Sequence, residues 1–157
     1  MDYLLLKSIH ILSSTLLFGT GLGSAFYKMR ADRDGDLGAI VFASRNIVLA
    51  DWFFTTPAII VQPVTGLWMA FDAGYPLTSL WIIASIALYV LAGACWLPVV
   101  HVQMRMRDLA AEALMRGTPL PEAYHRYGRI WFWLGVPAFS AVAIVFVIMV
   151  IKPGLAG

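Results

Sequence analysis

Residues 3–27 read YLLLKSIHILSSTLLFGTGLGSAFY, and this stretch decides the class of fold. A helix needs about 20 apolar residues to cross a bilayer. The stretch has that length, although Lys7 and His10 lie near its start. The whole chain agrees, because 61% of its 157 residues are hydrophobic, 13% are charged, and the mean hydropathy is +0.79. Such a composition does not suit a water-soluble surface. We therefore expect an integral membrane protein.

Three further stretches are long and apolar enough to cross a bilayer. The sequence thus predicts an all-α, integral membrane four-helix bundle that forms a single domain over residues 1–157. A formal net charge of +2 is too small to indicate a nucleic-acid partner, so the expected partner is the lipid bilayer. The single cysteine, Cys95, excludes an internal disulfide. The predicted spans are about 3–27, 47–71, 80–102 and 130–151.

The basic residues are distributed unevenly between the two ends of the expected bundle. Of the 11 Lys and Arg, only Lys7 and Lys152 fall on the side of the chain termini, and the loop after the second span has none. Cytoplasmic loops carry the excess of Lys and Arg. We therefore expect a multi-pass protein with the first and third loops inside and both termini outside. The other nine are Lys28, Arg30, Arg33, Arg45, Arg105, Arg107, Arg116, Arg126 and Arg129.

The two halves of the chain share a weak likeness. YKMRAD closes the first span and QMRMRD the third, and TTPAII with Pro57 falls where GVPAFS with Pro137 falls in the last span. A duplication would be a parallel two-helix repeat, with its axis along the membrane normal. Chance similarity between apolar segments explains the likeness equally well.

One face of the first span combines polar and small residues. At helical spacing the face contains Lys7, His10, Ser14, Leu17, Gly21 and Ser24. In lipid such a face should turn inward, because polar groups need partners and small residues let helices approach. The run Thr15, Gly19 and Gly23 predicts a second place of close approach.

His10 is the main candidate for function. It lies about 10 Å inside the start of the span, at 1.5 Å per residue, where its ring cannot reach water as Lys7 can. One interpretation is an imidazole hydrogen-bonded to Ser14, to Gln62 at matching depth, or to a carbonyl freed by Pro63. The other is a metal ligand, most simply the axial ligand of a b-type haem, with Lys7 meeting a propionate. The residues leave both open.

The remaining polar and aromatic residues are weaker candidates. His101 is expected at the cytoplasmic end of the third span, about a membrane's thickness from His10, so the two cannot share one iron. His125 is interpreted as a loop residue. Asp51 is expected to pair with Arg45 or to cap a turn. Membrane-interface belts are the favoured interpretation for Trp52, Trp131 and Trp133.

The segments LKSIHILSSTLLFGTGLGSAFY, TTPAIIVQPVTGLW and the closing VIKP carry a resemblance to known proteins. They resemble an uncharacterised bacterial family of predicted four-helix integral membrane proteins, and more distantly the HemJ-type protoporphyrinogen oxidases. The resemblance implies that His10 binds haem b. In the second helix, the HemJ pattern of Thr-Pro-Ala followed by Gly-Leu-Trp corresponds to residues 56–58 and 66–68 of this chain. The closing Lys-Pro of the pattern corresponds to Lys152 and Pro153.

The chain also departs from the HemJ pattern. That pattern has a lysine in the third helix, where LWIIASIALY carries no charge, and Asn-Glu before the proline of the fourth, where this chain has Gly135 and Val136 before Pro137. The resemblance therefore implies the haem ligand more than the oxidase activity.

We expect a haem b-binding protein of the bacterial inner membrane that serves in electron transfer or haem-linked redox chemistry. The candidate cofactor-binding residues are His10, Lys7, Ser14 and Gln62, with His10 as the metal ligand. The sixth ligand, the substrate and whether the protein is an enzyme stay open, as does the choice between a homo-oligomer and a membrane redox partner. The alternatives are a non-catalytic membrane subunit and a small transporter or metal-handling protein without haem.

Overall fold

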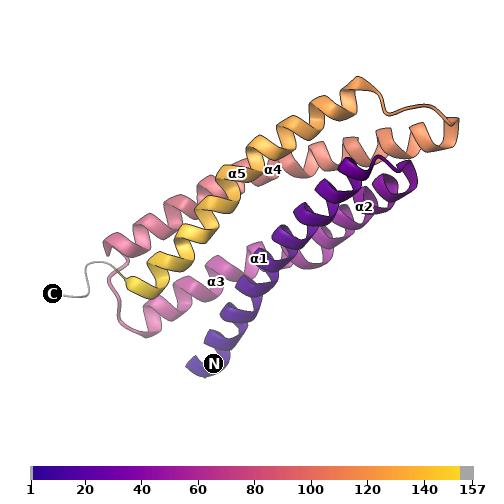
Figure 1. The fold of residues 1–157 in the computed structure, drawn as a ribbon. Coiled ribbons are helices and arrows are strands. Elements are labelled where there is room, and N and C mark those ends of the chain that lie inside the picture. The colour runs from indigo at the N-terminus through magenta and orange to yellow at the C-terminus, as the bar shows by residue number, and fades with distance from the viewer. Residues whose placement is uncertain (1, 153–157) are drawn as a thin grey trace.

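The computed structural model describes residues 2–152, and within that range every element is a helix (Figure 1). Four helical stretches are long and apolar enough to cross a membrane, which confirms the predicted all-α membrane fold. Pro153, part of the closing motif, lies outside the described residues. The elements are α1 (Tyr3–Asp34), α2 (Leu37–Ala50), the π-helical turn η1 (Asp51–Thr55), α3 (Thr56–Asp72), α4 (Leu80–Arg116) and α5 (Glu122–Ile151).

The helices extend well beyond the predicted spans at the end that carries most of the charge. With 32 residues α1 is about 48 Å long, against a hydrocarbon core of about 30 Å. Ion pairs between residues four apart continue the helix there, for example Arg30 with Asp34 at 2.8 Å. Gly35 then ends α1 in the left-handed conformation, and the Asp36 side chain caps α2 by accepting from the Ala39 N–H.

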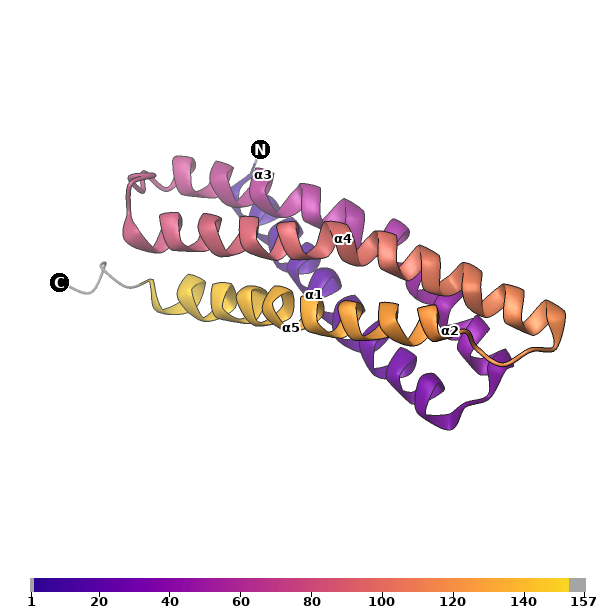
Figure 2. The same ribbon diagram turned by 90° about the horizontal axis from the view of Figure 1, so that it is seen from above.

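The helices pack as two pairs. The hairpin of α4 and α5 is one pair; α1 lies along the continuous rod of α2, η1 and α3 in the other. Figure 2 shows α1 crossing the α4–α5 hairpin obliquely, so that α1 and α5 touch little. The α1–α2 and α4–α5 turns lie at one end of the bundle, and the α3–α4 turn lies at the other (Figure 1). The predicted internal repeat stays a prediction.

A buried ionic group lies at the charged end of the bundle. Lys28, counted above as a loop charge, is only 3% exposed; its ammonium donates to the Asp32 carboxylate at 2.6 Å and to the Tyr124 hydroxyl at 2.5 Å. The Tyr124 hydroxyl in turn donates to Asp32 at 2.6 Å. Burial, and then the Asp32 carboxylate, raise the pKa of Tyr124, so it stays a neutral donor. These contacts tie α1 to α5 within an apolar cluster that includes Met106.

Pro63 leaves one carbonyl of α3 without its helical donor, and Tyr89 supplies a replacement. Proline has no N–H, so the carbonyl four residues earlier, that of Ile59, loses its hydrogen bond. The Tyr89 hydroxyl of α4 donates to this Ile59 carbonyl. The carbonyl suggested above as a partner for His10 is therefore bound to another helix.

The close approach predicted at Gly19 and Gly23 is wrong. A methyl group placed on either residue would meet no atom within 4 Å. The backbone approach to α1 occurs instead at Gly66 of α3, where such a methyl would lie 3.1 Å from Cε1 of His10. Small residues permit contact only on the face that meets a partner helix, and α1 meets α3 through the face that holds His10 and Ser13.

Candidate functional site

His10 lies between α1 and α3 with its ring orientation fixed. Its Nδ1 is 2.8 Å from the Thr65 hydroxyl oxygen, and that hydroxyl donates its own hydrogen to the Val61 carbonyl at 2.7 Å. With the Thr65 hydroxyl donating to the Val61 carbonyl, the matching tautomer of His10 carries its proton on Nδ1 and donates to Thr65. The neutral ring then has its lone pair on Nε2. A free Nε2 with an anchored Nδ1–H is the arrangement that metal-binding histidines require.

Gln62 belongs to this site, but its side chain does not bind the imidazole. Its amide nitrogen donates to the His10 carbonyl oxygen at 2.7 Å and to the Ser13 hydroxyl at 2.5 Å. Ser13 is buried, whereas Ser14, the serine predicted for this face, donates back to the Ile11 carbonyl of its own helix at 2.8 Å. Ser14 is therefore not brought to His10. Gln62 fixes the register of α3 against α1 around the histidine.

Lys7 is placed one turn before His10 on α1 and is exposed at the protein surface. His101 and His125 are exposed as well, and His125 packs edge-on against Tyr124. Among residues 2–152 there is no group of three or more His, Cys, Asp or Glu side chains able to hold a metal ion. Of the predicted tryptophan belt, Trp52 and Trp133 are 58% and 70% exposed, while Trp131 is partly buried.

Thr65, Ser13 and Gly66 are the site residues that sequence reasoning missed. Their signal was present, because Thr65 and Gly66 belong to the stretch VTGLW and lie within one turn of Gln62. On a helix, Gln62 and the pair Thr65–Gly66 share one face. The sequence prediction selected partners of His10 by their depth along the span, and this criterion selected only Gln62 on the second helix.

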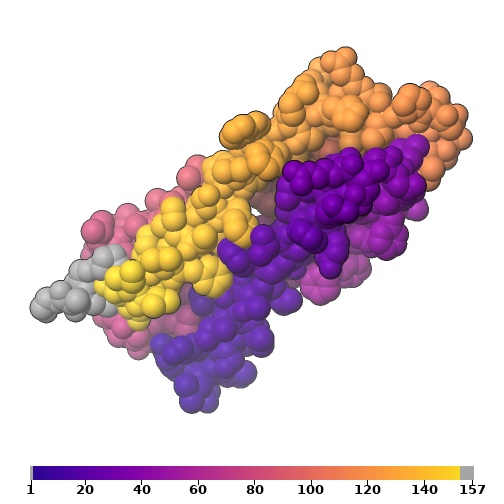
Figure 3. Space-filling view, viewed as in Figure 1, coloured from indigo at the N-terminus to yellow at the C-terminus, as the bar shows by residue number. Residues whose placement is uncertain are grey.

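A second buried polar group lies at η1. Asp51 is buried and accepts a hydrogen bond of 2.9 Å from the Thr55 hydroxyl, so the expected pairing with Arg45 is wrong. Arg45 is exposed, and the π-helical turn aims Asp51 inward. Figure 3 shows an opening between α1 and α5. A cavity of about 390 Å³ lies between the helices, with Leu17, Gly21 and Ser24 of the predicted α1 face in its wall.

These features define a class: an integral membrane protein of four helices with polar groups buried between them. Comparison with protein families then matches residues 4–153 to the family described as "Predicted integral membrane protein (DUF2269)". The chain belongs to this family, as the resemblance predicted. Comparison with curated proteins and with solved structures finds no match.

Proposed function

We propose that the protein binds one b-type haem in the membrane, with Nε2 of His10 as the protein atom that would hold its iron. The observation that supports the proposal is the hydrogen bond from His10 Nδ1 to Thr65, which directs the lone pair of the ring to Nε2. Haem iron needs few side-chain ligands because the porphyrin supplies the equatorial nitrogens. One oriented imidazole between two helices is therefore a sufficient donor set.

The neighbouring residues fit this role. Lys7, exposed and one turn nearer the chain terminus, would meet a propionate. Gln62 acts as a positioning residue, because it holds the His10 backbone and Ser13 rather than the ring. When bound, haem would supply one-electron redox chemistry. The chain's own contribution is to fix the imidazole between α1 and α3.

The proposal covers electron transfer or haem-linked redox chemistry in the bacterial inner membrane, with both chain termini outside. It does not include the oxidase activity of the HemJ-type enzymes, whose likeness to this chain stays a prediction. The stretch LWIIASIALY in α4 carries no charge, so the lysine of that pattern has no counterpart.

Absorption spectroscopy tests the haem proposal. The protein is expressed with full haem supply and purified in detergent, and the Soret absorbance per polypeptide is measured. His10→Ala should lose most of this absorbance while expression and membrane insertion persist, because the substitution removes the proposed ligand of the iron. Added imidazole should restore part of it by filling the gap that the side chain leaves.

Two matched variants complete the haem test. Lys7→Ala should keep most of the haem, since water or a lipid headgroup replaces one propionate contact. His101→Ala, an exposed histidine of α4, should have the parent's spectrum. Full Soret absorbance in His10→Ala would contradict the ligand assignment, and so would absence of haem from the parent protein.

The cavity supports a second candidate function. Its volume of about 390 Å³ is in the range of small-molecule sites, which supports a ligand-binding or transport protein. Purified parent protein without a Soret band would favour this candidate.

A further inference from the structure

Three buried polar atoms without partners meet at one place in the bundle. They are Oδ2 of Asp51, Oε1 of Gln103 and Nε1 of Trp96; none makes a hydrogen bond of standard geometry among the described residues, although the Gln103 amide is a neighbour of the Asp51 carboxylate. Asp51 and Gln103 are each 7% exposed. Buried polar atoms are nearly always paired, because an unpaired one costs roughly 1–3 kcal/mol. Three together mark a place where a further hydrogen-bonding partner would be stabilised.

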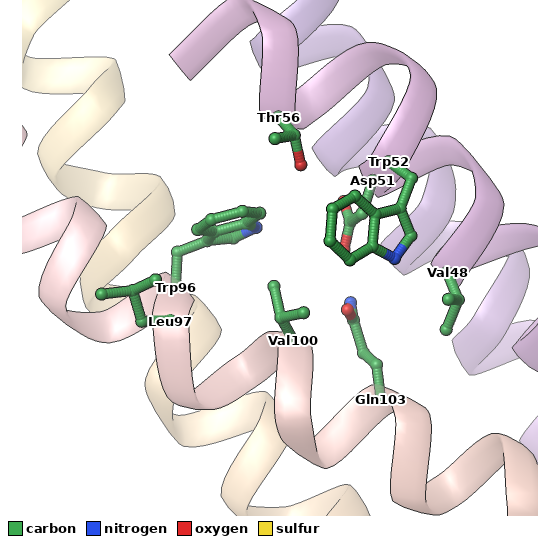
Figure 4. A pocket seen from close by; sticks show the side chains of 8 residues that line it. All are labelled: Val48, Asp51, Trp52, Thr56, Trp96, Leu97, Val100 and Gln103. Atoms are coloured by element: carbon green, nitrogen blue, oxygen red, sulfur yellow. The ribbon is translucent and has the colours of Figure 1, made fainter. Parts of the chain in front are cut away.

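The same three residues are the ones shared by the walls of two adjoining cavities. One cavity, of about 270 Å³, is lined by Asp51, Trp96 and Gln103 with Trp52 and Thr56 (Figure 4). The second, of about 390 Å³, has Asp51, Trp96 and Gln103 in its wall together with apolar residues of all four helices. The three polar atoms therefore lie where the two cavities adjoin, and the rest of each cavity wall is mostly apolar.

Charge decides the class of ligand. Among the described residues, neither cavity has a lysine or an arginine in its wall, so the Asp51 carboxylate faces the space without a counter-charge. Figure 4 shows Trp52 and Trp96 on opposite sides of the smaller cavity, with the Gln103 amide pointing toward Asp51. A buried carboxylate without a counter-charge, in a cavity that is otherwise mostly apolar, suits a cation.

We propose that the two cavities form a binding site for a lipophilic amine. Its ammonium group donates to Asp51 Oδ2 and Gln103 Oε1, and its apolar body fills the larger cavity. An inorganic cation would leave that apolar volume unused, and a neutral ligand would leave the carboxylate without a counter-charge.

The amine site is separate from His10. Thr65, the partner of His10, lies 14 residues after Asp51 on the continuous rod of η1 and α3, which corresponds to about 20 Å. The proposal therefore does not depend on haem binding, and His10→Ala should leave amine binding unchanged.

Equilibrium dialysis with the purified full-length protein in phosphatidylcholine nanodiscs tests the site. The probe is 1-naphthylmethylamine, the matched neutral compound is 1-naphthylmethanol, and uptake by empty nanodiscs is subtracted. The parent should bind the amine at least about tenfold more tightly than the alcohol, because a charge-assisted hydrogen bond is lost with the alcohol. Equal affinity of the two compounds would overturn the proposal without any variant.

Asp51→Asn keeps the size of the side chain and the acceptor for Thr55 but removes the charge. It should weaken amine binding at least about tenfold and leave alcohol binding and the melting temperature close to those of the parent. Asp72→Asn is the control, since Asp72 is an exposed acid at the far end of α3. Undiminished amine binding by a folded Asp51→Asn protein would also overturn the proposal.

Discussion

Glycine matters in this protein where a neighbouring helix touches it. The space that a side chain would occupy at Gly66 is filled by the His10 ring, because a methyl group there would lie 3.1, 3.7 and 4.0 Å from its Cε1, Nδ1 and Nε2. Gly19 and Gly23 have open space instead. The imidazole therefore packs directly against the α3 backbone, and the absence of a side chain at Gly66 lets His10 reach Thr65.

We expect Gly66→Leu to lower the stability of the bundle by about 1–3 kcal/mol, because the side chain must displace His10. Gly19→Leu is the matched control and should have little effect, since it projects into open space at the protein surface. Unfolding of both variants in detergent, followed by circular dichroism, measures the difference. Equal stability of Gly66→Leu and the parent would mean that the α1–α3 contact is looser than described.

The position of His10 could be predicted from the sequence, but its partners could not. Helical spacing and depth along the span placed His10 on an inward face near Gln62. The bond to Thr65 joins residues 55 apart in the chain, and it depends on the register between two helices. The sequence prediction placed Ser14 at the α1–α3 interface, but the neighbouring residue Ser13 lies there instead. The prediction was therefore wrong by one residue of helical register.

At the scale of the element, α3 tolerates a proline because α4 repairs its hydrogen bonding. Pro63 removes the donor for the Ile59 carbonyl, and the Tyr89 hydroxyl takes its place. In lipid an unpaired carbonyl has no water to bind. The proline in one helix and the tyrosine in the next therefore act as a pair.

We expect Tyr89→Phe to destabilise the protein by about 1 kcal/mol, because it leaves the Ile59 carbonyl unpaired. In a Pro63→Ala background the residue at 63 regains its N–H, so the same substitution should cost clearly less. Unfolding free energies of the parent, both single variants and the double variant form the required cycle. Additive effects would show that Tyr89 does not compensate for Pro63.

The four membrane-crossing elements could be predicted from hydropathy, but the π-helical turn could not. The second predicted span started at residue 47, whereas α2 starts at Leu37 and meets η1 at Asp51. Hydropathy reports which segments leave water and gives no information on helical pitch. A π-helical turn is short and leaves hydropathy unchanged, so the sequence prediction that Asp51 pairs with Arg45 or caps a turn did not place it at a cavity.

At the scale of the whole molecule, one of the basic side chains at the charged end of the bundle is buried. Lys28 is one of the nine basic residues at this end, yet it is buried against Asp32 and Tyr124. Eight basic residues at this end remain besides Lys28, against Lys7 and Lys152 at the other. The asymmetry that determines orientation therefore persists when the buried lysine is left out.

Orientation is testable with single cysteines placed at opposite ends of the bundle. In a Cys95→Ala background, Thr118→Cys lies in the α4–α5 turn and Thr78→Cys in the α3–α4 turn, and both positions are exposed. The excess of Lys and Arg places the α4–α5 turn in the cytoplasm. A membrane-impermeant maleimide added to intact spheroplasts should therefore label Thr78→Cys and spare Thr118→Cys, and both should react after lysis. The reverse pattern would put the charged end outside, and His10 would then lie in the cytoplasmic half of the membrane and Asp51 in the outer half.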